Sequence, residues 1–380
     1  MRISTTVIMI AVSLLSVPAL ASESYGTPFE GWGFVKDDWQ LVCDNTLTCR
    51  AAGYADEGIW DTPASILLTV IPQNPVPSVQ VNFEYREDDT SSNDKELGVT
   101  ELWLNDKDYG AIENDELNAK QIQQLLSHSR LNTKIEIRAS SNRWKISDKG
   151  MSAVLLKLDE VQGRVGTPLA LVSKSSLNRQ TPKTALKIPI VKKDYSYLDD
   201  AALKDGKQAL DPKKLVYFQA NIKRWIDIDS EQFIGSEDTT GDCQLINPKS
   251  ESSINLEKYS GDNINWEFTP VNAKHTLASH LCWQGAYNMG AGYWLINHAK
   301  PSKPQLITTS ASDYSDGEIY AIHKDRGIGD CWNRAVWVWD GKTFALTEDS
   351  STGMCRGFAG GAWDLPTYTS EVIRSDNKVN

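Results

Sequence analysis

The chain has 380 residues, of which 40% are apolar and 23% are charged, and its formal net charge is -11. This length suits two domains, and the apolar content is sufficient for a core in each. The acidic balance argues against nucleic acid and against anionic membrane surfaces as partners.

Residues 1–21 have the pattern of a secretory signal peptide. Arg2 supplies the positive start, Val7 to Val17 the apolar stretch, and Ala19-Leu-Ala21 the small-residue cleavage pattern. We expect the mature protein to begin near Ser22 and to be periplasmic or secreted. No later apolar run is long enough for a membrane span, so no transmembrane segment is expected in the mature protein.

Residues 22–175 are predicted to form an N-terminal α+β domain. Aromatic and β-branched residues with flanking turn residues indicate its strands, which are expected at 39–43, 47–50, 65–71, 78–85, 98–104 and 133–137.

Two helices are predicted in the same domain. Asn118 can cap the first, with Gln121 three residues on, as in a capping box. Ser147 is the expected N-cap of the second, and Gly163 is placed to stop it. The second helix has an apolar stripe, formed by Met151, Val154, Leu155, Leu158 and Val161. Lys157, Asp159 and Glu160 lie off this stripe, so we expect them to form a solvated face.

Residues 176–200 are rich in Lys, Ser, Thr and Pro and are predicted to be a linker. Residues 201–380 would then be a C-terminal β-rich domain. Residues 201–208 can be helical, and Asp211-Pro212 begins a helix that runs to about Ile222. Short strands follow, with turns roughly every 8 to 12 residues. The predicted fold class is α+β and β-rich, with two domains of short antiparallel strands and a few short helices.

The clearest hairpin joins a strand at Trp332 to Trp339 to one at Lys342 to Thr347. Asp340-Gly341 is expected to form a two-residue type I′ turn between them. With this turn, Trp337 faces Phe344 across the strands, and we assign Trp337 to the core. The neighbouring facing pairs would be Trp339 with Lys342 and Ala335 with Leu346.

The six cysteines all follow the signal peptide, and an even number of exported cysteines favours three disulfides. Many pairings are conceivable, and nearness in sequence favours Cys43 with Cys49, Cys243 with Cys282, and Cys331 with Cys355. A zinc site is the alternative, but neither the cysteines nor the histidines have a ligand spacing. No metal and no cofactor is therefore expected.

Common catalytic motifs are missing from the sequence. There is no Gly-x-Ser-x-Gly, no His-Glu-x-x-His, no P-loop and no dinucleotide fingerprint. Carboxylates cluster loosely between Asp313 and Asp330. A glycosidase needs two of them facing across a sugar, which spacing alone does not reveal.

The candidate ligand contacts lie near the hairpin. Loops carry binding residues more often than strand cores do. Aromatic rings stack on sugars, and charged groups bond hydroxyls. The residues expected to do so are Tyr287, Tyr293, Arg326, Asp330 and Arg334. Ordinary packing within a β-sandwich is the alternative for the aromatic residues.

Several motifs resemble the bacterial exported proteins of domain-of-unknown-function family 1176. They run in order from the first cysteines to the last: Trp39-x-x-x-Cys-Asp-Asn-x-x-x-Cys49, Gly150-Met-Ser-Ala-x-Leu-Leu-Lys-Leu-Asp159, Cys282-Trp-Gln-Gly-Ala-Tyr-Asn288, Gly327-Ile-Gly-Asp-Cys331, Trp337-Val-Trp-Asp-Gly341 and Cys355-Arg-Gly357. The first half is also distantly similar to the invasion-associated locus B proteins. The resemblance implies export and a β-rich architecture, and it implies no activity.

The sequence thus favours an exported, non-catalytic envelope protein that binds a glycan or an envelope protein. The alternative is a hydrolase acting on cell-wall or other glycan, and a third reading is a scaffold without a small ligand.

Overall fold

The computed structural model describes residues 31–56, 62–84, 98–130, 132–172, 174–175, 181–198, 210–226, 243–246 and 265–374. The fold is α+β and β-rich, as the sequence predicts. The expected signal peptide at 1–21 and the expected helix at 201–208 lie outside the described residues. Within them, no helix is both long enough and apolar enough to cross a membrane.

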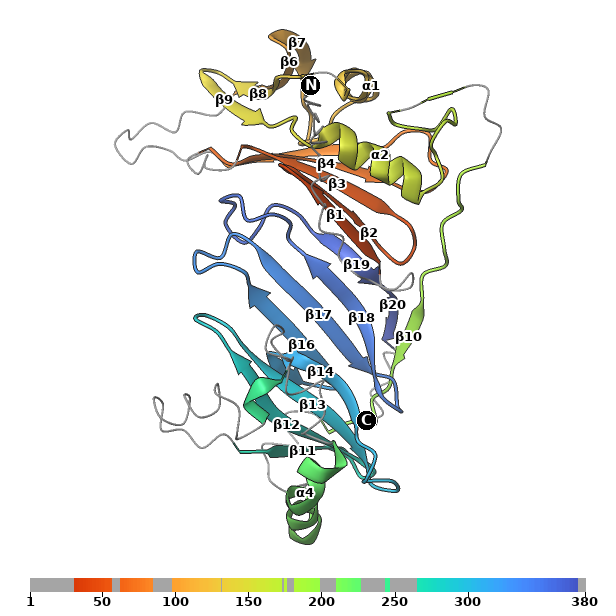
Figure 1. Cartoon of the computed structure of the whole chain (residues 1–380), viewed down its shortest axis with the longest axis vertical. Coiled ribbons are helices and arrows are strands. Elements are labelled where there is room, and N and C mark those ends of the chain that lie inside the picture. Colours follow the sequence, from red (N-terminus) through yellow and green to blue (C-terminus); the bar gives the residue numbers. More distant parts are fainter. Residues whose placement is uncertain are drawn as a thin grey trace, which may run out of the picture.

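The first half contains two antiparallel sheets and two helices (Figure 1). The first sheet has the order β1-β2-β3-β4-β5, formed by β1 (Trp32–Lys36), β2 (Trp39–Cys43), β3 (Cys49–Tyr54), β4 (Ala64–Val70) and β5 (Ser78–Phe83). The second sheet has the order β7-β6-β8-β9, formed by β6 (Thr100–Leu104), β7 (Lys107–Ala111), β8 (Ile135–Ala139) and β9 (Asn142–Ile146). The helices are α1 (Ala119–His128) and α2 (Met151–Val161).

The second half contains two larger antiparallel sheets. The third sheet has β11 (Glu267–Asn272), β12 (His275–Gln284), β13 (Met289–Asn297) and β14 (Gln305–Ala311). The fourth has β15 (Asp313–Ser315), β16 (Glu318–Lys324), β17 (Trp332–Trp339), β18 (Phe344–Ser351) and β19 (Leu365–Thr369). The remaining elements are β10 (Ile190–Lys193), α4 (Pro212–Trp225), the 3-10 helix η1 (Gln244–Ile246) and β20 (Glu371–Arg374). Residues 244–246, which lie in the region where short strands are expected, form a short helix instead.

The helix starts show which local signals decide the structure. Asn118 and Gln121 form the predicted capping box of α1, and Asp211 caps α4 as expected. Ser147 is wrong as the N-cap of α2, because Gly150 occupies that position and the helix begins at Met151. Gly150 has a φ of +93°, and a Cβ there would lie 1.9 Å from Lys36 O. Only glycine therefore lets α2 start this close to β1.

Asp159 of α2 is buried, with 0% of its surface exposed, so its assignment to a solvated face is wrong. Its carboxylate accepts hydrogen bonds from the N–H of Leu171 at 2.9 Å and of Val172 at 3.1 Å. Arg164, also fully buried, lies 3.7 Å from it. Burial raises the pKa of Asp159, and these bonds and the guanidinium oppose that effect. The segment after α2 folds back over the helix and covers the side chain.

The predicted hairpin is present, but its turn is wider than expected. Asp340 N–H bonds Thr343 O, and the Asp340 carboxylate accepts the N–H groups of Lys342 and Thr343, each at 2.8 Å. These bonds close a four-residue turn and shift the register. Trp339 therefore faces Phe344, and Trp337 faces Leu346.

The core between the third and fourth sheets is centred on Trp339. Its ring is fully buried and lies 5.2 Å from the Phe344 ring, centroid to centroid. Residues from both sheets pack around this pair, including Leu277 and Ile319. Trp337, assigned to the core from the sequence, is only partly buried against the same cluster.

The three disulfides join the predicted pairs, Cys43 with Cys49, Cys243 with Cys282, and Cys331 with Cys355. The first closes the β2–β3 hairpin, the second ties η1 to β12, and the third ties the start of β17 to the segment after β18. Three such bonds place the chain outside the cytoplasm, in an oxidising compartment.

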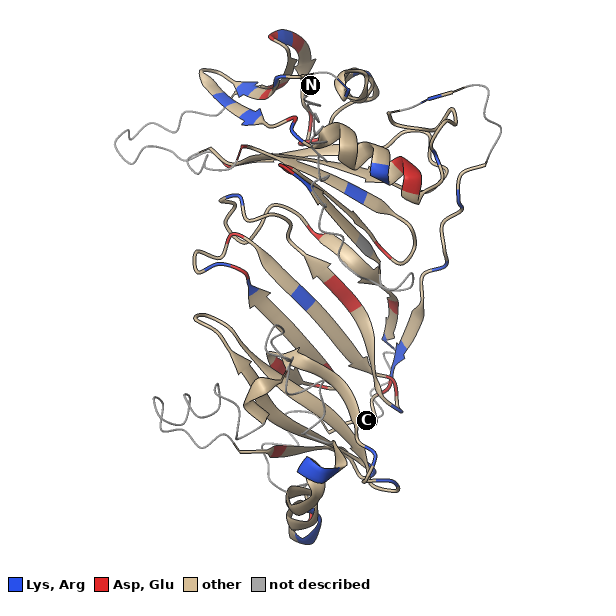
Figure 2. Ribbon diagram, viewed as in Figure 1, with Lys and Arg blue, Asp and Glu red and all other residues tan. Residues whose placement is uncertain are grey.

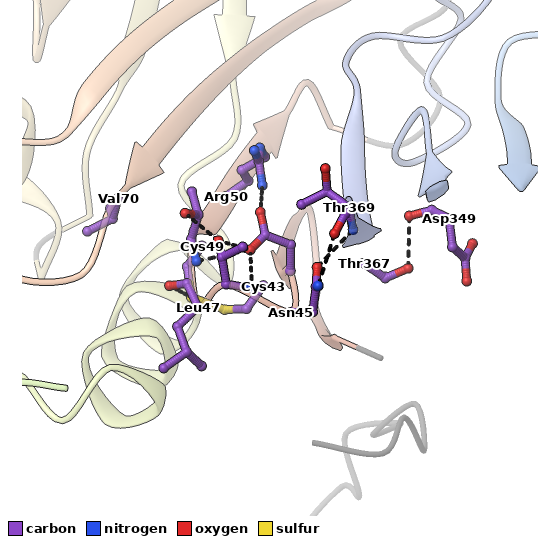
Figure 3. Close-up of polar contacts among 12 residues, drawn as sticks. Cys43, Asn45, Leu47, Cys49, Arg50, Val70, Asp349, Thr367 and Thr369 are labelled. Carbon is purple, nitrogen blue, oxygen red and sulfur yellow. Dashed lines mark hydrogen bonds and ion pairs between the residues drawn. A yellow bond between two sulfur atoms is a disulfide. The ribbon is translucent and has the colours of Figure 1, made fainter. Parts of the chain in front are cut away.

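The two halves of the chain share an apolar cluster. The fourth sheet lies between the first and third sheets (Figure 1). Side chains of the first sheet pack against the segment at and before β19, namely Val42, Ala52, Tyr54 and Leu67 against Phe358, Ala362 and Leu365. Asn45 donates to Thr369 O at 3.0 Å and accepts from Thr369 N–H at 2.8 Å (Figure 3).

The segment expected to be a linker, 176–200, contains β10, which pairs in parallel with β20. Glu318 of β16 anchors this two-stranded ribbon. It accepts hydrogen bonds from Lys193 of β10, Arg374 of β20 and Tyr320. The strand in this segment is therefore paired with β20 of the second half, and the division into two domains stays a prediction.

We expect Glu318 to make the protein less stable in acid. Burial alone would raise its pKa, but the bonds from Arg374, Lys193 and Tyr320 outweigh burial and lower the pKa from 4.5 to about 2. Because the folded pKa lies below the unfolded one, the stabilisation is complete above about pH 5 and is lost as the pH falls towards 2. Urea unfolding should show that Glu318→Gln costs roughly 1 to 3 kcal/mol at pH 7 and much less at about pH 2. Glu371→Gln, at an exposed position of β20, is the control; an equal cost of Glu318→Gln at both pH values would contradict the assignment.

Trp339→Ala should lower the free energy of unfolding by about 3 to 5 kcal/mol, because it empties the centre of the sandwich. Trp337→Ala, on the same strand, should cost only about 1 to 2 kcal/mol, since its ring is partly solvated. Chemical denaturation of both variants tests this order. A larger cost for Trp337→Ala would restore the core assignment made from the sequence.

Candidate functional site

A groove with a volume of about 520 Å³ crosses one face of the fourth sheet. We call it the sheet groove. Strand pairing places Ile322 opposite Arg334 and Arg334 opposite Ser350, so their side chains share one face. Its lining from the strands is Ile322, Lys324, Trp332, Arg334, Glu348 and Ser350, and its lining from the loops is Gly327, Ile328, Gly329, Thr352, Gly360 and Asp364.

Trp332 lies in the sheet groove and is held in one orientation. Its indole N–H donates to Gly329 O at 2.8 Å, and its backbone N–H donates to Thr352 Oγ1 at 2.8 Å. The indole N–H is therefore satisfied within the protein. What the partly exposed ring can offer a ligand is its apolar face.

Charges of both signs border this ring. Arg334 of β17 forms an ion pair with Glu348 of β18, with Nε and Oε1 3.4 Å apart. Figure 2 shows a basic and an acidic residue on these neighbouring strands. Both side chains keep solvent contact, with 51% and 35% of their surface exposed, so both can still bond another molecule. Lys324 and Asp364 add one further charge of each sign.

Two of the ligand contacts expected from the sequence lie at the sheet groove. Arg334 lines it directly. Tyr287 stands beside it, since its ring centroid is 5.5 Å from the Lys324 ammonium and a Cβ on Gly327 would lie 3.0 Å from the ring. Tyr287 is 56% exposed, which suits a rim position.

Arg326 and Asp330 form an ion pair at the two ends of the loop 327–329, which lines the sheet groove. Asp330 is 2% exposed and accepts the Gly357 N–H at 2.8 Å, while Arg326 also donates to Cys355 O at 2.9 Å. Burial opposes ionisation of Asp330, but the bonds from Arg326 and Gly357 outweigh it, and the pKa of the carboxyl lies below its ordinary value. The pair thus ties the loop to the disulfide-bonded segment, and Asp330 is covered by protein.

Tyr293 of β13 is placed elsewhere. It packs against the cluster between the third and fourth sheets, and burial raises the pKa of its hydroxyl to about 12. Tyr293 thus packs between two sheets, which is the alternative that was considered for the aromatic residues.

Sequence reasoning missed most of the lining. Trp332 was read only as part of a hairpin, and Glu348 and Asp364 were not considered. The alternation along β16 to β18 could have placed Lys324, Trp332 and Arg334 on one face, but the register needed for this came only with the structure.

Among the residues that the structure describes, one cluster has the composition of a metal site, made of Asp325, Cys331 and Cys355. Both cysteines are joined in a disulfide, so neither offers a thiolate. This donor set does not fit a metal ion.

Asp330→Ala should lower the free energy of unfolding by about 1 to 3 kcal/mol, because it leaves the Gly357 N–H and the Arg326 guanidinium without their acceptor. Asp313→Asn, at an exposed carboxylate of the same half, should change it by less than about 0.5 kcal/mol. Thermal and chemical denaturation measure both. If Asp330→Ala kept full stability, the assignment of Asp330 to holding the loop would be wrong.

Comparison with known proteins adds one match. A family profile described as "Protein of unknown function (DUF1176)" matches residues 34–370. No curated protein and no solved structure shows a significant match to the chain.

Proposed function

The chain belongs to the DUF1176 family of proteins of unknown function, and we propose that it is a non-catalytic binding protein of the cell envelope that holds a glycan in the sheet groove. The observation that carries this proposal is the Trp332 ring, fixed by its bond to Gly329 O in a groove that Arg334, Glu348 and Asp364 also line.

The lining chemistry matches a sugar. A pyranose has an apolar face that stacks on an aromatic ring and a rim of hydroxyls that need donors and acceptors. Arg334 and Lys324 donate, Glu348 and Asp364 accept, and Ser350 can do either. Tyr287 at the rim would extend the contact along a chain of sugars.

The periplasm is the compartment we propose. The disulfides require an oxidising environment, and the signal pattern of residues 1–21 directs export. Envelope glycans are the sugars that a protein would meet there.

A glycan hydrolase is the second candidate, because two carboxylates, Glu348 and Asp364, line the same groove. Hydrolysis by the usual routes needs two carboxyl groups flanking the glycosidic bond. Incubation with peptidoglycan and assay of released reducing ends distinguishes the two candidates. Release that Glu348→Gln abolishes would replace binding by hydrolysis as the function.

Binding is tested by titration calorimetry with soluble peptidoglycan fragments. Trp332→Ala should weaken binding about tenfold, the equivalent of about 1.4 kcal/mol, and Trp332→Phe should retain most of it because a ring remains. Trp103→Ala is the matched control, since Trp103 is a partly exposed tryptophan of the second sheet, stacked on Arg138.

Melting curves of the same variants separate binding from folding. Arg334→Ala should weaken binding with little change in melting, because this side chain is exposed. If the wild type binds no fragment at millimolar concentration, the glycan proposal falls, and a scaffold or protein-interaction role takes its place.

A further inference from the structure

A second groove, in the first half of the chain, is separate from the sheet groove and has different chemistry. It has a volume of about 670 Å³, within the range of small-molecule sites. One wall is α1, and the others are formed by the Pro75–Pro77 turn and by Leu171, Val172 and Lys174. We call it the helix groove.

The walls of the helix groove are fixed by the buried charges of Asp159 and Arg164. Arg164 donates to Asn74 O at 3.1 Å and to Leu169 O at 2.8 Å, so it ties the turn to the opposite segment. Asp159 accepts the N–H groups of Leu171 and Val172, which line the groove. A groove held in this way exists before a ligand arrives, which reduces the entropy lost on binding.

The lining combines apolar side chains with two neutral polar ones, Gln123 and Ser127, and has a cationic edge. Ile122, Leu126, Leu171 and Val172 are buried or partly buried and face it together with Val76, which is 49% exposed. Its charged lining residues are Arg130 and Lys174. Both are exposed, and within the described part of the chain neither forms an ion pair.

Two cations in the lining of one groove stand out because the chain as a whole carries a net charge of -11. The described lining of this groove contains no carboxylate. Asp159, whose charge acts on Lys174, is buried behind the lining and lies beside Arg164. The complementary ligand has an apolar body and an anionic head.

We propose that the helix groove binds a small amphiphile with one alkyl chain and an anionic head group, either a carboxylate or a phosphate. The chain lies along Ile122, Leu126 and Leu171, and the head group reaches Arg130 and Lys174. This site does not depend on glycan binding in the sheet groove.

The test is titration calorimetry of the full exported chain with four ten-carbon probes below their micelle concentrations. Decanoate and decyl phosphate should bind, and their relative affinities distinguish the two head groups. Decanol and decylamine should bind several-fold more weakly, because they lack the charge that the cations attract. Equal affinity for decanoate and decylamine would overturn the proposal.

Variants locate the site. Arg130→Gln and Lys174→Gln should each weaken decanoate binding about three- to fivefold, the size expected for an exposed ion pair. Lys120→Gln is the matched control, because it removes the same charge from α1 at a position that does not line the groove. An equal loss with Lys120→Gln would show a nonspecific charge effect and refute the site.

Ala119→Trp fills the helix groove from its exposed edge and should abolish binding of both anionic probes with an unchanged melting curve. Glycan binding by this variant should equal that of the wild type. If Ala119→Trp still binds decanoate with full affinity, the amphiphile lies elsewhere and the inference is wrong.

Discussion

The position of the sheet groove depends on one contact, between the Tyr54 hydroxyl and the backbone at Gly353 and Met354. Tyr54 is fully buried, and its Oη accepts the Met354 N–H at 3.2 Å. Gly353 has a φ of +90°, and a Cβ there would lie 2.1 Å from Oη, so only glycine permits the approach. This contact docks the segment 352–365 on the first sheet, and the same segment supplies Thr352, Gly360 and Asp364 to the groove.

Further contacts connect the docked segment 352–365 to the opposite wall of the sheet groove. Cys355 is joined to Cys331, and Arg356 bonds Asp38 of the first half at 2.9 Å. The Gly357 N–H bonds Asp330, which holds the loop before Trp332. The residues that line the sheet groove therefore belong to the second half, but one of its walls is docked on the first half. A division into two domains describes the sheets, but the groove needs their interface.

The sequence predicted correctly those features of the structure that depend on local interactions. The capping box of α1, the start of α4 and the disulfide pairs all lie within short stretches or between near neighbours. The hairpin register failed because one side chain, Asp340, bonds two backbone N–H groups and widens the turn. The prediction that Asp159 is exposed failed because the residues that bury it follow the helix in sequence. The helix groove escaped prediction because its walls come from segments far apart in the sequence. The sheet groove was predicted only in part, through Arg334 and Tyr287, because its lining depends on the strand register.

A buried carboxylate plays the same part in each groove. Asp330 and Asp159 accept backbone N–H groups from a returning segment, and each lies beside an arginine, Arg326 or Arg164. From the sequence, one was read as a ligand contact and the other as a solvated residue. Burying a carboxylate is costly unless it is paired and hydrogen-bonded, so each returning segment is held to the geometry that supplies those bonds. Loops constrained in this way keep a groove open without a ligand, which is the condition that a preformed binding site requires.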